Sequence, residues 1–368
     1  MVWAILVVGG FLLRLPVNAK KWSAPFLFSG YVIDSDDAIT INQTMPRNGA
    51  LNEANRAQQD EFYTQLSDIE NELKHYVAHF KGKTVLCNCD DPRVSNFFHY
   101  FAYNFERLGL KRLITTCYKN QDTYLFSESK SERAVYLIYD GDKNGNRIPD
   151  AEEIGVYPLE GDGDFRSTEC IELLKQADIV VTNPPFSLFR EYVAQLIKYD
   201  KKFLIIGNQN AISYSDIFSL LKQNKIWIGY KFGDMSFKVP SHYLPRATRY
   251  WQDESGQKWR SMGNICWFTN LDIAKRHDEL ILYKKYTSEE YPKYDNYEAI
   301  NVGAVSEIPV DYQFEMGVPI TFLGKYCPEQ FEIIGRMTTT TIDAENFGYP
   351  IVNGKRIYAR IIIKRKQL

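Results

Sequence analysis

The chain has few cysteines, little net charge and no long hydrophobic run. Its 368 residues include 6 cysteines, none of them in a Cys-x-x-Cys pair, and carry a formal net charge of −2. Sparse, unpatterned cysteines exclude a disulfide framework and indicate a reducing, cytoplasmic setting. A net charge near zero excludes a global field that would attract nucleic acid, so any polyanion-binding surface must be local.

Residues 1–17 are the stretch that raises a question of targeting. This apolar run is shorter than the ~20 residues of a bilayer span. It carries Arg14 and lacks the basic region that precedes the apolar part of a secretory signal. An atypical signal sequence or an N-terminal anchor is one interpretation. We favour a non-native extension, since Met45 offers a better start. We expect residues 1–51 to be non-conserved or disordered, with no stable membrane partner.

Two stretches invite a metal-site interpretation, and neither completes the pattern. Cys87 and Cys89 should point to one face of a predicted strand, but no His or Cys set with zinc spacing accompanies them. Residues 140–150 begin like an EF-hand calcium loop, but Ala151 occupies the twelfth position. Loops rich in Asp, Asn and Gly are common at hairpin tips without any metal. We therefore assign no metal ligand, and calcium stays the minor alternative for the second stretch.

From about residue 67 to residue 223, amphipathic helices alternate with short apolar strands. The predicted helices are 68–80 (capped by Ser67 or Asp68), 96–108 (capped by Ser95), 167–176, 188–199 and 215–223 (capped near Ser213). The predicted strands are 84–89, 113–118, 134–139, 156–159, 178–182, 203–207, 226–230 and 265–269. This alternation predicts an α/β fold with a doubly wound, mostly parallel sheet. The last two strands have no helix between them and predict an antiparallel edge hairpin.

The strand 178–182 runs into Asn183-Pro184-Pro185-Phe186, and a helix follows. The two prolines fix φ and remove two backbone donors, and Pro184 pushes Asn183 towards an extended conformation. This corner is therefore rigid. It projects the Asn183 amide from the end of a strand, which is where open α/β sheets bind their ligands. An ordinary strand-ending turn is the alternative.

Five motifs in order resemble the EcoRI-type adenine-specific DNA methyltransferases, which depend on S-adenosylmethionine and carry an Asn-Pro-Pro-Phe motif. They are Asp60-Glu61-Phe62-Tyr63-Thr64, residues 90–97 (DDPRVSNF), the corner at Asn183, residues 264–270 (NICWFTN) and residues 316–322 (MGVPITF). The resemblance covers residues 52–368. It implies a Rossmann-like methyltransferase fold with a smaller accessory region, S-adenosyl-L-methionine as cofactor and double-stranded DNA as partner.

The resemblance assigns catalysis to the corner, Asn183, Pro184, Pro185 and Phe186. The Asn183 side-chain carbonyl and the Pro184 main-chain carbonyl would accept the two N–H bonds of adenine N6 and free its lone pair. Phe186 would stack on a base flipped out of the duplex.

The cofactor is expected across the carboxyl ends of the first strands. The residues that the resemblance places there are Phe62, Tyr63, Thr64, Asn88, Asp90, Asp91, Pro92, Asp162, Asp164 and Phe165. Asp164 is expected to meet the adenine amine of the cofactor, with Asp162 as the competing acid, although turn and cap formation would also explain these carboxylates. The strand 113–118 ends in Cys117-Tyr118 instead of an acid, so the residues that hold the ribose stay open.

DNA contacts are expected in residues 232–263, where cations alternate with aromatic residues. The candidates there are Lys238, Arg246, Arg249, Trp251, Lys258 and Arg260. A solvated loop with an aromatic cluster is the alternative. Residues 52–271 would form the methyltransferase domain, and residues 272–368 a C-terminal accessory region that contacts DNA.

We therefore predict a site-specific DNA adenine-N6 methyltransferase that transfers a methyl group to a flipped adenine. It would serve a restriction-modification system, with a restriction endonuclease of the same site as candidate partner. Two alternatives stay open. One is an amino-methyltransferase acting on rRNA guanine or protein glutamine, and the other is a catalytically inactive, DNA-binding relative.

Overall fold

The computed structural model describes residues 2–8, 11–17, 62–88, 95–116, 134–146, 149, 152–241 and 243–366. The chain divides into two compact units, Met1–Ala54 and Asn55–Leu368. In the first unit, β1 (Val2–Val8) pairs antiparallel with β2 (Phe11–Val17), and most of the predicted extension lies outside the described residues. No helix in the described ranges is long and apolar enough to span a membrane.

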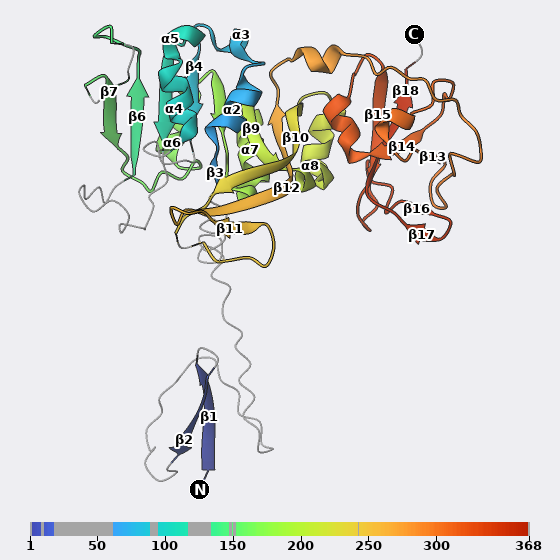
Figure 1. Cartoon of the computed structure of the whole chain (residues 1–368), viewed down its shortest axis with the longest axis horizontal. Coiled ribbons are helices and arrows are strands. Elements are labelled where there is room, and N and C mark those ends of the chain that lie inside the picture. Colours follow the sequence, from blue (N-terminus) through green and yellow to red (C-terminus); the bar gives the residue numbers. More distant parts are fainter. Residues whose placement is uncertain are drawn as a thin grey trace. The chain divides into compact units, whose positions relative to one another are not determined.

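The second unit is built on a ten-stranded sheet in the order β3-β10-β12-β9-β8-β4-β5-β6-β7, with β11 paired to β12 (Figure 1). The strands are β3 (Tyr63–Thr64), β4 (Thr84–Cys87), β5 (Arg112–Thr116), β6 (Val135–Tyr139), β7 (Ile154–Pro158), β8 (Ile179–Thr182), β9 (Lys202–Asn208), β10 (Trp227–Lys238), β11 (Tyr250–Gln252) and β12 (Lys258–Thr269). The central strands β5, β4, β8 and β9 run parallel, and the flanking strands pair antiparallel. The predicted α/β fold, with its parallel centre and antiparallel hairpin, is confirmed.

Helices cover both faces of this sheet. They are α2 (Leu66–Leu73), α3 (Val77–Phe80), α4 (Asn96–Tyr103), α5 (Phe105–Leu108), α6 (Thr168–Gln176), α7 (Phe189–Lys198) and α8 (Ser215–Lys222). The apolar sides of α6, α7 and α8 join one core cluster with Val180, whereas α2 to α5 join a second cluster with Val181. Because neighbouring residues of β8 enter different cores, the sheet is wound on both sides.

Two predicted helices are each divided in two. The helix predicted at 68–80 begins after Gln65, not at Ser67 or Asp68, and separates into α2 and α3. The helix predicted at 96–108 separates into α4 and α5 at Asn104, whose side-chain amide donates 2.7 Å to the Tyr100 carbonyl and so competes with the helical ladder.

One predicted helix cap is confirmed and another is wrong. Ser95 caps α4 as predicted, accepting from the Phe98 amide at 3.5 Å, whereas α8 has Tyr214 at its cap position and no side-chain cap near Ser213. Ser213 instead donates to the Asn210 carbonyl.

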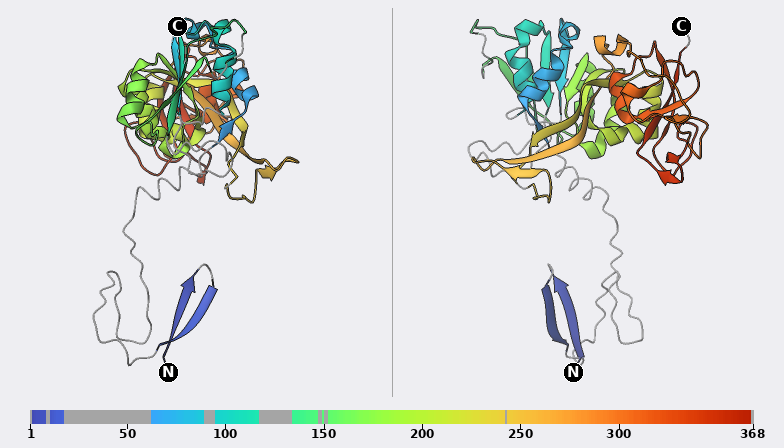
Figure 2. Two further views of the ribbon diagram at one scale, coloured as in Figure 1. Left: turned by 90° about the vertical axis from the view of Figure 1, so that its left-hand side faces the viewer. Right: turned by 45° about the vertical axis from the view of Figure 1, so that its right-hand side comes forward.

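The segment 232–263, interpreted from sequence as an excursion between short strands, is largely strand. β10 and β12 continue far beyond β9, and β11 adds a third strand, forming a projecting hairpin that we call the arm (residues 235–262; Figure 2). The pairing of β10 with β12 shifts register between Gly233 and Met235, and Gly233 has φ +128°, which favours glycine. The strand pattern was hidden because most arm residues are partly or fully exposed, so apolar and polar positions do not alternate cleanly.

Residues 272–368 contain a second, smaller sheet in the order β13-β14-β18-β15 and a separate hairpin, β16-β17. These strands are β13 (Ile300–Asn301), β14 (Met316–Pro319), β15 (Phe331–Met337), β16 (Ile351–Val352), β17 (Lys355–Arg356) and β18 (Arg360–Arg365). The 3-10 helices of the chain are η1 (Phe186–Leu188), η2 (Gln209–Ser213), η3 (Ala274–His277), η4 (Val305–Glu307) and η5 (Ile320–Lys325). Strands therefore form most of the regular secondary structure in the region that the sequence predicts as accessory from position 272.

Candidate active site

The Asn-Pro-Pro-Phe corner follows the carboxyl end of β8, in the middle of the large sheet. All residues of β8 are buried between β4 and β9. The Thr182 hydroxyl donates to the Asn88 carbonyl, and the Tyr192 hydroxyl donates to the Asn88 side-chain oxygen. These bonds tie the ends of β4 and β8 to α7, the helix after the corner. Asn88, predicted near the cofactor, therefore also fixes the position of the corner.

The amide of Asn183 is held in one orientation. The residue is 6% exposed, and its Nδ2 donates to the main-chain carbonyl of Phe62 at 2.6 Å. A carbonyl oxygen can only accept, so the nitrogen must face Phe62 and Oδ1 must face the other way. That Oδ1 is buried and has no hydrogen-bond partner within the part of the chain that the structure describes. The corner thus presents a fixed acceptor that bonds to no other described residue.

Aromatic rings form a cluster beside the corner. The Phe186 ring is half-buried and stacks on the Phe62 ring, with centroids 5.5 Å apart and an interplanar angle of 26°. Phe237 and Tyr243 lie 5.5 and 6.0 Å from the Phe62 ring. The predicted catalytic Phe186 and the predicted cofactor residue Phe62 therefore belong to one aromatic cluster beside Asn183.

The predicted cofactor segment 62–64 passes directly over the corner. Thr64 pairs with Phe237 of β10, and its carbonyl accepts from the Asn96 side chain at 2.7 Å. The Thr64 hydroxyl oxygen is buried and lacks a partner among the described residues. The predicted cofactor residues Asp90, Asp91 and Pro92 lie outside the described residues.

The loop with the two competing acids is anchored to α7. The Phe165 ring packs edge-on against Tyr192 at 5.0 Å, and its carbonyl accepts from Gln195 at 2.9 Å. Both carboxylate oxygens of Asp164 accept from Arg166, at 3.0 and 2.7 Å. Partial burial alone would raise the pKa of Asp164, but the hydrogen bonds from Arg166 bring that pKa below its usual value. Asp162 is exposed and accepts only from the Asp164 amide, at 3.0 Å.

A third unpartnered oxygen at this edge was not predicted from the sequence. Thr115 lies opposite Cys87 in the parallel pair of β4 and β5, close to the carboxyl end of β5. Its hydroxyl oxygen, like Asn183 Oδ1 and Thr64 Oγ1, is buried without a partner in the described ranges. The sequence prediction expected an acid at the end of this strand. A threonine near the end of a buried strand was the feature that could have indicated Thr115. These three atoms fit a ligand that brings its own donors and acceptors.

The arm places its side chains on two faces. Trp251, Trp259 and Lys238 stand opposite one another on β11, β12 and β10, and the two indole rings stack at 6.1 Å. The Lys238 ammonium lies 5.6 Å from the Trp259 ring. On the other face, Phe237 is buried against the Phe62 ring. One face of the arm therefore joins the active-site cluster and the other is free.

The six predicted DNA-binding residues separate into two groups. The Lys258 ammonium donates to the carbonyls of Ser241 and Tyr243, and Arg260 donates to the Thr248 and Arg249 carbonyls, so these two cations stabilise the arm. Arg249 pairs with Asp234 at 2.6 Å. The exposed group, available to a partner, consists of Lys238, Arg246, and Trp251.

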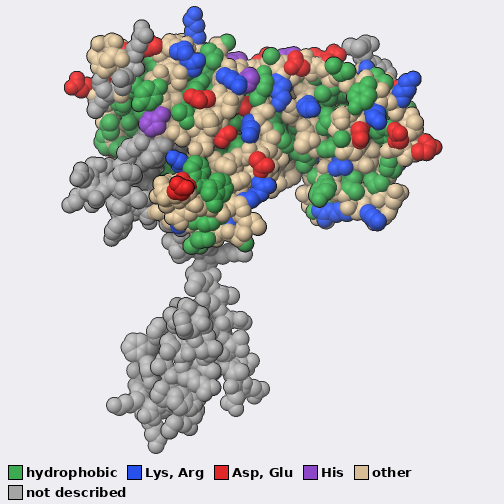
Figure 3. Space-filling view, in the orientation of Figure 1, with side chains coloured by type: hydrophobic (Ala, Val, Ile, Leu, Met, Phe, Trp, Pro, Cys, Tyr) green, Lys and Arg blue, Asp and Glu red, His purple; other side chains and the backbone are tan. Residues whose placement is uncertain are grey.

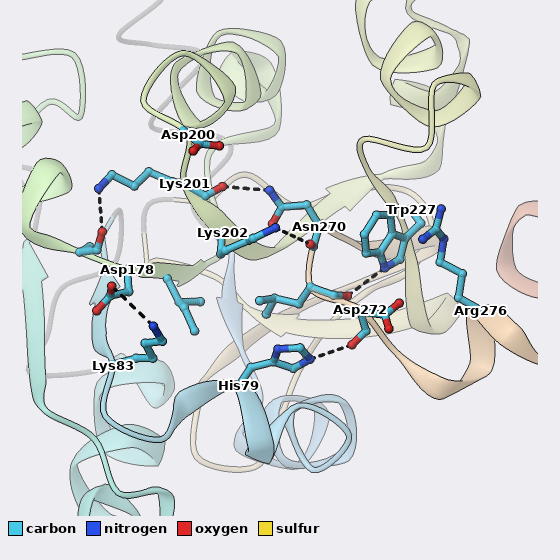
Figure 4. A pocket seen from close by; sticks show the side chains of 13 residues that line it. His79, Lys83, Asp178, Asp200, Lys201, Lys202, Trp227, Asn270, Asp272 and Arg276 are labelled. Carbon is cyan, nitrogen blue, oxygen red and sulfur yellow. Dashed lines mark hydrogen bonds and ion pairs between the residues drawn. The ribbon is translucent and has the colours of Figure 1, made fainter. Parts of the chain in front are cut away.

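A cavity of about 640 Å³ lies at the opposite, amino edge of the parallel strands (Figure 4). Several of its polar side chains already bond to the chain. His79 Nε2 lies 2.7 Å from the Asp272 carbonyl, Trp227 donates to the Leu271 carbonyl at 2.9 Å, and Lys201 donates to the Ala177 carbonyl at 2.7 Å. Open α/β sheets bind ligands at the carboxyl ends of their strands, so this cavity is not the candidate active site.

Comparison with known proteins gives the family of the chain. The family model described as "Adenine-specific methyltransferase EcoRI" matches residues 50–366. The type II methyltransferase M.EcoRI of Escherichia coli is 51% identical over 325 residues, covering 87% of this chain and 98% of its own length. The type II methyltransferase M.MgeORF184P of Mycoplasma genitalium is 39% identical over 337 residues, covering 86% of this chain and 99% of its own length.

Among solved structures, a protein of Pyrococcus horikoshii whose title names an RNA methyltransferase is 13% identical, with a TM-score of 0.30. It covers 59% of this chain and 89% of its own, and the likeness is too low to carry an argument.

The fold and the comparisons define a methyltransferase in which the Asn-Pro-Pro-Phe corner follows β8, an inner strand of the parallel set. The chain belongs to the EcoRI family of adenine-specific methyltransferases, whose members named above are type II enzymes of DNA methylation. Such enzymes imply S-adenosylmethionine as cofactor. Thr64 and Thr115 leave buried hydroxyl oxygens without a partner among the described residues, so this edge fits a cofactor that brings polar groups of its own.

Proposed function

We propose that this enzyme methylates the N6 amine of adenine at a specific site in double-stranded DNA, as part of a restriction-modification system. The observation that carries the proposal is the buried, unpartnered Oδ1 of Asn183, fixed by the Phe62 carbonyl. An acceptor buried without a partner costs ~1–3 kcal/mol. A substrate amine would supply the missing donor and remove that cost.

The chemistry required of the protein is mainly positioning. The lone pair of adenine N6 is delocalised into the ring, so the amine is a weak nucleophile. Acceptance of its two N–H bonds by Asn183 Oδ1 and the Pro184 carbonyl would turn the nitrogen towards tetrahedral geometry and localise that lone pair. When bound, S-adenosylmethionine supplies a methyl group on a sulfonium. The nitrogen–carbon bond forms as the carbon–sulfur bond breaks, and the amine then loses a proton to water.

The burial of Asn183 supports base flipping. A stacked, paired adenine could not reach an oxygen that is part of a residue only 6% exposed. Phe186, half-buried beside it, offers a ring on which an extruded base would stack. The arm projects from the same side and would lie along the duplex, because a β-ribbon fits the major groove.

Substrate class and product are tested together by tritium-methyl transfer from the cofactor. Duplex DNA, rRNA and a glutamine-containing protein are offered separately, and the labelled DNA is digested to nucleosides. We expect label in duplex DNA alone, and as N6-methyl-2′-deoxyadenosine alone. Label in rRNA or protein but not in DNA would replace the proposal by the amino-methyltransferase alternative. DNA binding without any transfer would favour the inactive relative.

The restriction-modification role has its own test. Modified adenines in DNA from cells that express the protein are mapped by sequencing. We expect one recognition sequence to be modified, and DNA carrying it to resist the endonuclease that cuts that sequence. Scattered modification without a common sequence would contradict site specificity.

A further inference from the structure

The hairpin β16-β17 in the accessory region has a rigid, pre-formed turn. Asn353 and Gly354 have φ of +52° and +72°, the signs required by a two-residue type I′ turn. The Asp295 carboxylate accepts from both turn amides, at 3.1 and 2.7 Å. The Asp295 amide also donates to the Ile351 carbonyl at 2.8 Å. The carboxylate thus fixes the hairpin tip to the body of the accessory region.

The strand that leaves this turn presents two cations to solvent. Lys355 and Arg356 are both exposed, and no ion pair with either is found among the described residues. The Arg356 guanidinium lies over the Tyr349 ring at 3.1 Å from its centroid, which fixes the guanidinium in place. Tyr349 is itself held, since its carbonyl accepts from Asn296 at 3.0 Å. Tyr358 follows, 90% exposed.

The hairpin and the arm lie on the same side of the second unit. In Figures 1 and 2, β11 and β16-β17 both lie on the side away from α3 and α5, the helices that precede the amino ends of β4 and β5. That side is therefore the side of the carboxyl ends, where the corner stands. Figure 3 shows Lys and Arg side chains along the edge of the accessory region that carries the hairpin.

We propose that the β16-β17 hairpin binds the phosphate backbone of the same DNA duplex, at a distance from the methylated base. This inference rests on the proposed function. A duplex is a long polyanion, and a protein with a net charge of −2 must bind it through local cations. Two cations on a rigid two-stranded ribbon provide such a contact. Because Arg356 is stacked on Tyr349, its guanidinium would need little reorganisation to bind phosphate. The contact fixes position along the duplex and reads no bases.

The test compares two charge-matched variants of the full chain. Lys355→Gln/Arg356→Gln removes the hairpin cations. Lys81→Gln/Lys111→Gln removes two exposed cations near the amino edge, beside the starts of β4 and β5. Both pairs are exposed, so neither should affect folding, and circular dichroism and thermal melts check this. Duplex binding is then measured against salt concentration, with a long duplex and with one trimmed to the recognition site.

For the hairpin variant on the long duplex, we expect the slope of log Kd against log salt to fall by about 2. Binding at ~50 mM salt should weaken about tenfold, with kcat at saturating DNA unchanged. The trimmed duplex should show a smaller difference, and the amino-edge variant should match the wild type on both.

Three results would overturn the hairpin proposal. The first is that the hairpin variant binds DNA with the affinity and salt slope of the wild type. The second is that the amino-edge variant loses as much affinity as the hairpin variant. The third is that the hairpin variant loses kcat at saturating DNA. Wild-type binding of DNA combined with a change of oligomeric state in the hairpin variant would point instead to a protein contact. A wild-type enzyme that neither binds nor methylates duplex DNA would refute the proposed function itself, and the two failures are therefore distinguishable.

Discussion

At the amino edge of the parallel strands, a cavity of about 640 Å³ is lined by side chains that already bond to the chain, whereas at the carboxyl edge buried side-chain oxygens have no partner among the described residues. Among the side chains that line the cavity, Arg276 has a buried Nε without a partner in the described ranges. The carboxyl edge has three such atoms, all oxygens, on Asn183, Thr64 and Thr115. Since a buried unpaired polar atom costs ~1–3 kcal/mol, a fold retains several at one edge where a ligand completes them. We therefore expect the active site at the edge with the three unpartnered oxygens and not at the cavity.

The strongest test of this contrast is the substitution Asn183→Ala. It removes the fixed acceptor and leaves the sheet beneath it intact, because β8 contributes its own buried residues to the core. We expect kcat for methyl transfer to fall by about 10³-fold, with duplex affinity largely retained. Single-turnover transfer and a binding titration measure the two quantities. Loss of DNA binding together with transfer would contradict this division of roles.

The substitution Phe186→Ala tests the aromatic wall beside the acceptor. Stacking of an extruded base on an aromatic ring contributes ~1–3 kcal/mol, so kcat/KM for DNA should fall about 10- to 100-fold. Phe186→Tyr keeps the ring and should restore most of the activity. Fluorescence of 2-aminopurine placed at the target position reports base extrusion. Equal activity of the alanine and tyrosine variants would exclude stacking on this ring.

A buried acid with all its bonds made provides the counter-example to Asn183. Glu72 is 1% exposed and accepts from the Tyr230 and Lys231 amides at 2.7 and 2.8 Å and from the Tyr76 hydroxyl at 2.9 Å. A Cβ at Gly229 would lie 2.3 Å from the Glu72 carboxylate, which explains the glycine. Glu72→Gln replaces one carboxylate oxygen by an NH2 group, which then faces a hydrogen-bond donor and cannot accept from it. The free energy of unfolding should therefore fall by about 2 kcal/mol, with kcat nearly unchanged.

The same variant carries a pH signature. Burial raises the pKa of Glu72, although the two backbone amides and Tyr76 oppose the rise. A raised folded-state pKa means that the ionised form opposes folding. The wild type should therefore lose stability as pH rises from the ordinary value of about 4.3 through the raised value, and Glu72→Gln should not. Urea unfolding of both proteins across this range measures the difference, and parallel curves would contradict it.

A smaller effect should distinguish Asp162 from Asp164, the two acids of the loop that is predicted to bind the cofactor. Asp164 already uses both oxygens for Arg166, whereas Asp162 keeps one carboxylate oxygen without a bond to the described chain. Asp162→Asn should raise the KM for S-adenosylmethionine about tenfold, the loss of one charge-assisted hydrogen bond. Asp164→Asn should mainly lower thermal stability. A larger KM effect for Asp164→Asn would support the assignment of Asp164 that the family resemblance implies.

The smallest effect is expected at the amino edge. Lys83 and Lys202 are exposed at the cavity, and Lys83→Gln/Lys202→Gln removes both charges. We expect kcat and both KM values to stay within about twofold, since surface substitutions change stability by only ~0.5 kcal/mol. A tenfold loss in any of the three would assign a function to the cavity.

The alternating periodicity predicted the centre of the fold because its strands are buried on both faces and read as apolar runs. Val180 and Val181 enter different cores, so both had to be apolar. The corner was predictable because two prolines after a buried strand leave few conformations. The division of a helix at Asn104 and the helix start after Gln65 were not predictable. Each depends on local bonds or tertiary packing that periodicity does not record.

The arm and the atoms at the carboxyl edge show why the remainder needed the structure. Lys258 and Arg260 have the composition of DNA contacts, yet they bond to carbonyls of their own arm. The unpartnered state of Thr115 and the orientation of the Asn183 amide depend on which atoms approach across the sheet. The sequence specifies which residue types are present at the site. The hydrogen bonds of the folded chain decide which of these side chains can still bind a ligand.

Under the proposed function, the hydrogen bond between Asn183 and Phe62 would make one short segment part of two binding sites. Residues 62–64 are expected at the cofactor, and the Phe62 carbonyl orients the amide that is expected to hold the base. Whatever shifts this segment on cofactor binding must shift the acceptor as well. Cofactor and target adenine are then thermodynamically linked, so the factor by which one tightens the other's binding is the same in both directions. An enzyme built in this way would commit to an extruded base most firmly when the methyl donor is already in place.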